Sequence, residues 1–254
     1  MEHLTICELC RKPKELRLSH IIPKSFYRYA KKDGDKSQLV VLREGATKPI
    51  VSNADPKERL LCQACEIHLE QKFENQGTRI LLNVKKIKKI SDTSLLFKSY
   101  KYKSLYLFYI SILWRVSISE MYEHINLRGF NDILRKCINS NTLIIKGDVR
   151  LDQFIRVSLF KITDKSGVLS SNCLRGIILE PNVERPELYK DGTIYFMMLH
   201  GFLIVYRFYD QQNLSLELAG QLSSRGSSII PIKDISDFKI LTDIINTAVD
   251  IRGN

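Results

Sequence analysis

Short apolar runs alternate with charged turns over the first thirty residues, a pattern typical of a small β-hairpin followed by a helix. Residues 6–10 and 15–18 predict two short strands joined by a turn. A proline opens a predicted helix over 23–29, since proline is tolerated in the first turn, where its missing N–H would have had no partner. The polar residues 31–57 then predict an insertion that is mostly loop, with one candidate strand at 38–43.

Two further helices are predicted from apolar positions at helical spacing. Residues 66–75 place their apolar side chains on one face, and after a break at Gly77 the pattern resumes over 80–90. Lysines fill the remaining positions of this second helix: Lys85, Lys86, Lys88 and Lys89. A lysine-rich helix face fits a phosphate backbone, but it is just as often a face that only meets solvent.

The rest of the chain predicts two helices followed by a series of strands. A strongly apolar run predicts a buried helix over 95–116, and a second helix over 120–139 is expected to bend at Gly129. From residue 142 the pattern changes to short apolar runs separated by glycine turns, which is typical of strands. The expected strands are 142–145, 154–162, 175–179, 193–199 and 202–209, the last two joined by a His200-Gly201 hairpin turn, and a closing helix is expected over 234–251.

These elements predict an α+β protein in two parts with a boundary near residue 90. Residues 1–90 would form a small module, and residues 91–254 a larger domain of helices and antiparallel sheet for targeting, oligomerisation or partner binding. No run reaches the roughly 18 uncharged apolar residues of a membrane span, so none is expected. The N-terminus lacks a basic region followed by an apolar one, so we expect no secretion and a cytoplasmic location.

Charge is unevenly distributed along the 254 residues, whose formal net charge is +11. Residues 1–103 hold 22 Lys and Arg against 12 Asp and Glu, and therefore carry +10 of that charge. A concentrated positive field favours a polyanionic partner such as nucleic acid, although the same charge also serves solubility alone. The candidate phosphate contacts are Lys24 and Arg28, together with the four lysines of the predicted helix over 80–90.

Four of the six cysteines are paired at metal-binding spacing, as Cys7-x-x-Cys10 and Cys62-x-x-Cys65. In a chain without a secretion signal, this pattern predicts one tetrahedral zinc site rather than disulfides. Four thiolates complete the coordination of zinc, so the site would be structural and would close the base of the 31–57 insertion. The alternative is four free thiols in a reduced core.

Any chemistry would then come from residues beside the zinc. His20 leaves the predicted strand pair and Glu66 directly follows Cys65, so the zinc frame can bring the imidazole opposite the carboxylate. In a basic cleft these two groups are the minimum for metal-assisted phosphodiester cleavage, in which the carboxylate holds Mg²⁺ or Mn²⁺ and the histidine takes a proton from water. Without such a frame, a lone histidine before Ile-Ile-Pro is more often a structural residue.

Three motifs of the module follow one another in the order found in a known family, although the insertion between His20 and Cys62 is long for that family: Cys7-x-x-Cys10, then Ser19-His20-Ile21-Ile22-Pro23-Lys24, then Leu60-Leu61-Cys62-x-x-Cys65-Glu66. Over about residues 5–75 the chain thereby resembles the zinc-bearing branch of the HNH endonucleases. The resemblance implies a treble-clef (ββα-metal) fold around a structural zinc. It also implies hydrolysis of phosphodiester bonds with the help of a second, catalytic cation.

The resemblance assigns roles to particular positions of this chain. His20 matches the general base, Glu66 matches a ligand of the catalytic cation, and Asn53 is the asparagine of the intervening loop, where the family uses one to orient the histidine. Two positions depart from the family. Ser19 stands where the family usually has Asp, and Glu66 stands where it usually has His or Asn, so the single carboxylate of the cation site would lie on the other side of the cleft.

Three functions remain open on the sequence. The first is a metal-dependent endonuclease, with DNA as the favoured substrate and a homodimer or partner protein held through residues 91–254; small proteins of this kind resemble nuclease effectors of bacterial defence or mobile-element systems. The second is a non-catalytic zinc module that binds nucleic acid, since Ser19 removes a carboxylate from the cation site. The third is a protein-interaction adaptor in which the zinc only braces a docking surface.

Overall fold

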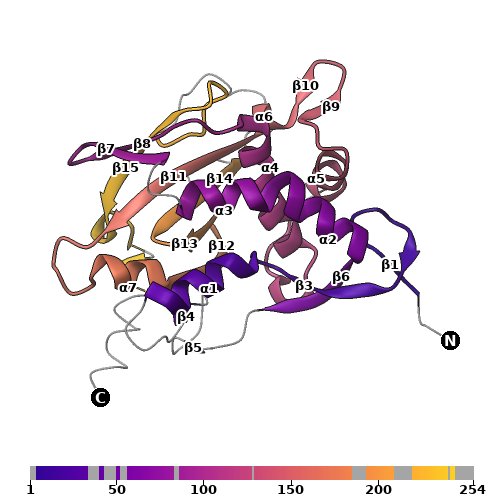
Figure 1. The fold of residues 1–254 in the computed structure, drawn as a ribbon, viewed down its shortest axis with the longest axis horizontal. Helices are drawn as coiled ribbons and strands as arrows, with labels where there is room; N and C mark the ends of the chain where they lie inside the picture. Colours follow the sequence, from indigo (N-terminus) through magenta and orange to yellow (C-terminus); the bar gives the residue numbers. More distant parts are fainter. Residues whose placement is uncertain are drawn as a thin grey trace.

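A large sheet covered by helices forms most of the molecule, and a cysteine-bearing module extends from one end of it (Figure 1). The computed structural model describes residues 4–33, 40–42, 50–51, 56–82, 86–127, 129–184, 193–208, 219–239 and 241–243. Helices and strands are both abundant in these residues, and four cysteines cluster in the N-terminal module, so the predicted α+β class is confirmed.

Among the described residues, two antiparallel strand pairs, one short helix and one interrupted helix build the N-terminal module. β1 (Thr5–Ile6) pairs with β2 (Pro13–Lys14), and β3 (Leu16–His20) pairs with β6 (Lys57–Cys62). α1 (Lys24–Asp33) follows β3 directly. After β6 the chain continues as one helical rod made of α2 (Gln63–Leu69), a π turn (Glu70–Glu74) and α3 (Asn75–Leu82).

In the part of the chain that the structure describes, nine strands form the large sheet, in the order β5-β4-β12-β13-β14-β11-β15-β8-β7. All neighbours are antiparallel except β4 with β12 and β11 with β15, so the sheet is mixed rather than purely antiparallel. The strands are β4 (Val40–Leu42), β5 (Ile50–Val51), β7 (Ile87–Ser91), β8 (Ser94–Phe97), β11 (Ile155–Thr163), β12 (Ile177–Glu184), β13 (Thr193–Leu199), β14 (Phe202–Phe208) and β15 (Ser228–Asp234).

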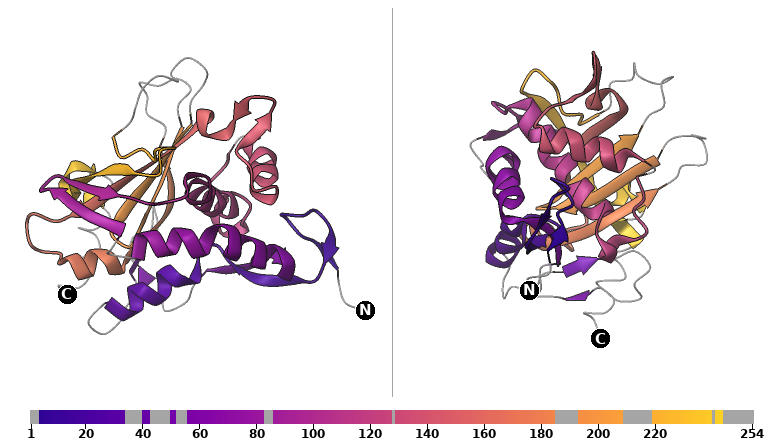
Figure 2. Two further views of the ribbon diagram at one scale, coloured as in Figure 1. Left: turned by 45° about the horizontal axis from the view of Figure 1, so that its top comes forward. Right: turned by 90° about the vertical axis from the view of Figure 1, so that its right-hand side faces the viewer.

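The central helix α4 (Tyr102–Ser117) is buried from Leu105 to Val116 between the sheet and the helical rod (Figure 2). Tyrosines fix it to the sheet: Tyr106 donates a hydrogen bond to the Ile155 carbonyl of β11, and Tyr206 of β14 donates one to the Tyr109 carbonyl. The remaining elements are α5 (Phe130–Asn139), α6 (Leu151–Phe154), α7 (Ser171–Gly176), the hairpin of β9 (Ile144–Lys146) and β10 (Val149–Arg150), and the 3₁₀ turns Glu120–Tyr122 and Ile235–Asp237.

One hydrophobic core runs across the expected boundary at residue 90. It contains Cys7 and Leu9 of the module, nearly all of α4 and one face of the sheet as far as Ile230. The sheet also takes strands from both sides of that boundary, since β4, β5 and the start of β7 come before residue 91. A second, smaller core lies on the opposite face of the sheet, under α7 and the segment around Ile235. The module is therefore packed onto the larger domain rather than tethered beside it.

The predicted helix over 80–90 is wrong in its second half, and so is the start of the predicted helix over 95–116. α3 ends at Leu82, and residues 87–97 form the β7–β8 hairpin at one edge of the sheet, pairing through β8 with β15. The apolar residues in this short stretch fit the helical period as well as the strand period. The open edge of β15 supplies the backbone hydrogen-bonding partners that make the stretch a β-hairpin. The predicted helix over 120–139 is a 3₁₀ turn and then α5, separated by Gly129, whose φ of +85° cannot continue a helix.

The strongest strand prediction is confirmed. β13 and β14 pair along their full length, and His200 and Gly201 form a two-residue turn in which both φ angles are positive, at 53° and 71°. Such a turn matches the twist of the flanking strands, and glycine adopts its second position without strain. Of the closing helix predicted over 234–251, the structure describes only the first residues. They form a 3₁₀ turn (Ile235–Asp237) and a short helical segment at 241–243.

Candidate functional site

Four cysteines converge at the junction of the two hairpins and the helical rod. The sulfur atoms of Cys7, Cys10, Cys62 and Cys65 all lie within 4.8 Å of one another. This spacing and an all-thiolate donor set fit a tetrahedral metal such as zinc, which would leave no coordination position open for catalysis. A hydrogen bond from the Cys65 thiol lowers the pKa of Cys7 to about 4, the direction that favours a metal-binding thiolate. The cluster could therefore hold a structural metal ion such as zinc.

Local backbone geometry brings each cysteine pair into place. In the first knuckle Arg11 adopts a left-handed φ of 58°, and its N–H donates to the Cys7 carbonyl at 2.8 Å, which closes the turn. In the second knuckle, Cys62 ends β6 and Cys65 lies in the first turn of α2. The Cys62 N–H donates to the Cys7 sulfur at 3.3 Å, so the backbone of one knuckle already stabilises a thiolate of the other.

The end of β3 lies against the first turn of α2, the helix that carries Cys65 of the cluster. Ser19 is 1% exposed, and its hydroxyl accepts a hydrogen bond from the Leu61 N–H at 3.2 Å. The carboxylate of Glu66, at the start of the helical rod, lies close enough to this hydroxyl for Ser19 to lower its pKa. His20 follows Ser19 as the last residue of β3, where its ring is partly exposed. The two positions that the HNH resemblance assigns to the catalytic cation, Ser19 and Glu66, are therefore in contact.

Glu66 lies in a half-buried environment rather than in open solvent. Burial raises the pKa of its carboxyl group, and the Ser19 hydroxyl and the Arg115 guanidinium partly offset that rise. One of its oxygens, Oε1, is enclosed and has no hydrogen-bond partner among the described residues. A buried carboxylate oxygen without a partner is costly, and a cation or a proton would relieve the cost.

Arg115 is a member of the site that the sequence did not point to. It belongs to α4 and is 1% exposed, yet its Nη1 donates to the His20 carbonyl at 2.9 Å. Its Nη2 lies 2.8 Å from Glu74 Oε1 in the π turn, an ion pair without the alignment of a hydrogen bond. Its position as the one charged residue in the apolar run 104–116 was the only signal for it in the sequence.

The module is fastened to the larger domain at three further points. Ser119 at the end of α4 donates to Glu58 Oε2 of β6 at 2.5 Å. Arg135 of α5 donates to the Leu9 carbonyl in the first knuckle at 3.1 Å. The His68 ring bonds to the Ile138 carbonyl of α5 at 3.0 Å, so this histidine is engaged in docking and points away from Glu66.

The basic residues expected to contact nucleic acid do not form one helical face. Lys24 and Arg28 are exposed on α1, which begins four residues after His20. Lys86, Lys88 and Lys89 lie on or next to β7, at the opposite edge of the sheet from β4 and β5. In this hairpin Lys86 donates to the Ser99 carbonyl at 2.8 Å and Lys89 pairs with Asp92 at 2.6 Å. Lys85 and Asn53 lie outside the described residues.

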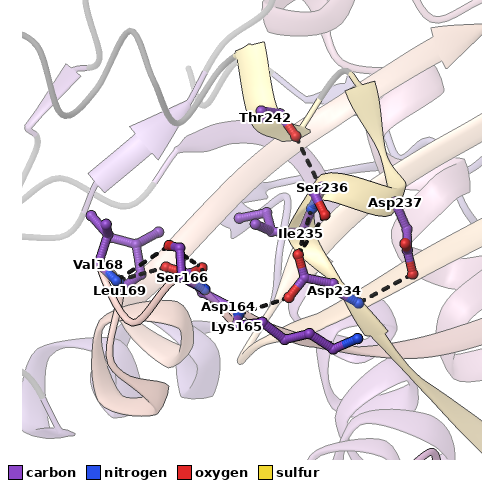
Figure 3. Close-up of a pocket in the computed structure, with 10 residues that line it drawn as sticks. All are labelled: Asp164, Lys165, Ser166, Val168, Leu169, Asp234, Ile235, Ser236, Asp237 and Thr242. Atoms are coloured by element: carbon purple, nitrogen blue, oxygen red, sulfur yellow. Dashed lines mark hydrogen bonds between the residues drawn. The ribbon is translucent and has the colours of Figure 1, made fainter.

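A cavity of about 640 Å³ lies at the other end of the sheet, between the loop after β11 and the turn after β15 (Figure 3). The carboxylates that line it accept hydrogen bonds from backbone N–H groups. Asp164 accepts from the N–H groups of Ser166 and Leu169, and Asp234 accepts from those of Lys165 and Ser236. These bonds hold two loops together, and none of the residues expected at the site lines this cavity.

Comparison with known proteins adds no family assignment. No family model, curated protein or solved structure matches the chain. In the described part of the chain, every helix is too short or too polar to cross a membrane. What can be said of function therefore depends on the four-cysteine centre and the residues that it holds together.

Proposed function

We propose that this protein is a metal-dependent endonuclease of the HNH type that hydrolyses phosphodiester bonds, with DNA as the favoured substrate. The observation that carries the proposal is the contact between Ser19 at the end of β3 and Glu66 at the start of α2. These positions are 47 residues apart in the sequence. They correspond to the two cation-holding positions of the family, and His20, the proposed general base, is next to one of them.

Glu66 and Ser19 would hold the catalytic Mg²⁺ or Mn²⁺, and the enclosed Glu66 Oε1 supplies the observation that fits such an ion. Mg²⁺ is often held by only one or two carboxylates, with water and substrate phosphate completing its coordination. Once bound, the cation would polarise the scissile phosphate and stabilise its developing charge. His20 would take the proton from the attacking water, since an imidazole is the side chain best matched to that task near neutral pH.

Substrate approach would use the positive field of the module. Lys24 and Arg28 are exposed on the helix that follows His20, so phosphates near the site would meet cations on the same element. Contacts of this kind position a nucleic-acid backbone without reading its sequence. The proposed partner is therefore a nucleic acid bound mainly through its phosphates, with salt-dependent affinity.

Two features of the site favour a second candidate function, a zinc module that binds nucleic acid without cutting it. Ser19 contributes no charge to the cation site, and the Arg115 guanidinium lies close enough to lower the pKa of Glu66. Both features weaken a site for a divalent cation. Under this alternative the positive surface is retained and the carboxylate of Glu66 has only a structural role.

The test is cleavage of supercoiled plasmid in the presence of Mg²⁺ or Mn²⁺ by wild type, His20→Ala and Glu66→Gln. His124→Ala is the matched control, because His124 is exposed on the larger domain, where its ring contacts the Pro181 carbonyl and the Tyr122 ring. An endonuclease predicts a loss of at least about 100-fold for His20→Ala, the usual contribution of a general base, and none for His124→Ala. Equal cutting by wild type and His20→Ala would refute it, and metal-independent binding without cutting would establish the alternative.

A further inference from the structure

We infer that Arg115 is a positioning residue for His20, and that the π turn of the helical rod serves to give Arg115 its counter-charge, Glu74. This inference rests on the proposed function, because it concerns the geometry of the proposed general base. It assigns to the larger domain a direct part in shaping the site, through one side chain of its central helix.

The contacts of the Arg115 guanidinium account for its burial. Nη1 donates to the His20 carbonyl at 2.9 Å, and Nε donates to the Ser111 carbonyl one turn earlier in α4 at 3.3 Å. Nη2 meets Glu74 at 2.8 Å. A buried guanidinium needs a paired charge. Here Nε and Nη1 are hydrogen-bonded, and Nη2 has the ion pair with Glu74 but no hydrogen bond. The His20 main chain is therefore one of three points that fix this side chain, and is fixed by it in return.

The π turn explains how Glu74 reaches Arg115. In a regular helix, eight residues separate Glu66 and Glu74 by about 80° around the axis, since each residue adds about 100°. A π turn inserts one residue without its share of rotation, which reduces the separation to about 20°. The interruption at Glu70–Glu74 thereby turns Glu74 to the same side as Glu66. The influence of the Glu74 charge on Glu66 agrees with this shared face.

Fold stability alone gives little reason for such an arrangement. Replacing a buried ion pair by apolar residues of similar size is often neutral or stabilising, so packing would be served as well without the pair. Arg115 also binds the main-chain carbonyl of the proposed base, while Ser119, two residues after the end of the same helix, holds β6 through Glu58. Both strands that carry the site are thus attached to the end of α4. A misplacement of about 1 Å at a catalytic group can cost about 100-fold in rate.

The experiment compares wild type with a charge-free double variant, Arg115→Met with Glu74→Met, which leaves no unpaired buried charge. The matched control is Arg135→Met, which removes an arginine that likewise bridges the larger domain to a main-chain carbonyl of the module, at Leu9 instead of His20. Arg115→Lys is included as the conservative variant. We measure kcat and KM for plasmid cleavage with Mn²⁺, zinc content, and hydrogen–deuterium exchange of peptides covering residues 16–22 and 193–208.

For the double variant we expect normal zinc content, a KM within about threefold of wild type and a kcat lower by about 100-fold. Exchange should rise in residues 16–22 and stay unchanged in 193–208. Arg115→Lys should recover part of kcat, and Arg135→Met should keep wild-type kcat. Wild-type kcat in the double variant would overturn the inference.

Hydrogen–deuterium exchange tests this inference independently of the proposed nuclease activity. If wild type does not cut at all, the nuclease proposal fails, while increased exchange confined to residues 16–22 still supports the anchoring of β3 by Arg115. Unchanged exchange in residues 16–22 overturns the inference that Arg115 anchors β3. If the double variant does not fold, Arg115→Lys and Glu74→Gln provide the same comparison, and unchanged exchange in both again overturns the inference.

Discussion

Gly77 lies inside α3 at the point where this helix crosses α4, and we expect Gly77→Ala to destabilise the protein. A Cβ atom at this position would lie 2.1 Å from Phe108 Cδ1 and 2.2 Å from Cγ. Carbon atoms approach to about 3.5 Å without repulsion, so the ring would have to move by about 1.4 Å. Phe108 is fully buried and stacks against Phe26 of α1 at a centroid distance of 6.2 Å, which leaves it little room to move.

Two effects of opposite sign set the magnitude. Alanine is favoured over glycine inside a helix by about 1 kcal/mol. Overpacking of a well-filled core costs about 1–3 kcal/mol and occasionally more, and a contact of 2.1 Å belongs at the upper end of that range. The net loss in the free energy of unfolding is therefore about 2 kcal/mol. For a chain of this size that corresponds to a decrease in Tm of about 4–8 °C.

Urea denaturation followed by circular dichroism, together with thermal scans, measures this loss. The decisive comparison is Gly77→Ala combined with Phe108→Leu, because the smaller side chain leaves space for the new methyl group. The double variant should be more stable than the sum of the two single effects by at least about 1 kcal/mol, as expected for residues in direct contact. A Gly77→Ala variant as stable as wild type would show that the helices separate without cost, and the reasoning would be refuted.

Two further predictions concern the metal centre and a buried lysine. Cys62→Ser should lose zinc to a chelator at concentrations that wild type withstands. Cys137→Ser, which changes a buried thiol outside the cluster, should keep its zinc. Equal metal content in the two variants, measured by mass spectrometry, would contradict a four-cysteine site. Burial and the neighbouring Arg175 lower the pKa of Lys161 from 10.5 to about 8, so the folded state binds this proton less well than the unfolded state. Lys161→Met should therefore raise the free energy of unfolding at pH 7 by up to about 3 kcal/mol. This difference in the free energy of unfolding should shrink as pH rises from 8 to 10.5, because Lys161 of the wild type then loses its proton in the unfolded state as well. A difference that does not change with pH in urea titrations would contradict the prediction.

The four-cysteine cluster was predictable from the sequence because its geometry is local. Each Cys-x-x-Cys pair is a short turn, and two such turns need only to meet. The hairpin at His200 and Gly201 was predictable for the same reason, since two residues decide the turn and the flanking runs decide the strands. Features of this kind depend on few residues that are close in sequence.

The lysine-rich stretch was not predictable, because its conformation depends on a distant partner. Ile87 and Ile90 are spaced as in a helix, and nothing within the segment excludes that period. The free edge of β15, more than 130 residues later in the chain, pairs with β8 and makes the stretch a hairpin. The lysines consequently lie at a sheet edge, where charged side chains also protect the edge from pairing with other chains.

Two residues of the candidate site, Arg115 and Glu74, could not be predicted from the sequence either. Ser19, His20 and Glu66 follow from the motif, but Arg115 and Glu74 depend on a π turn and on the crossing of two helices. A π turn leaves no periodic signature in five residues. The clue that was available, a lone arginine in the apolar run of α4, has no meaning until its partner is known.

The crossing at Gly77 and the ion pair at Arg115 belong to one arrangement. Glu74 lies three residues before Gly77 in the helical rod, and Arg115 lies seven residues after Phe108 in α4, so both contacts join the same two helices within two turns. The close approach that a glycine permits is what brings the Glu74 carboxylate to the guanidinium. Gly77→Ala should therefore also loosen the hold of Arg115 on His20, with increased exchange in residues 16–22, and adding Phe108→Leu should restore protection together with stability. Recovery of stability without recovery of that protection would mean that the helix crossing and the His20 anchor are independent.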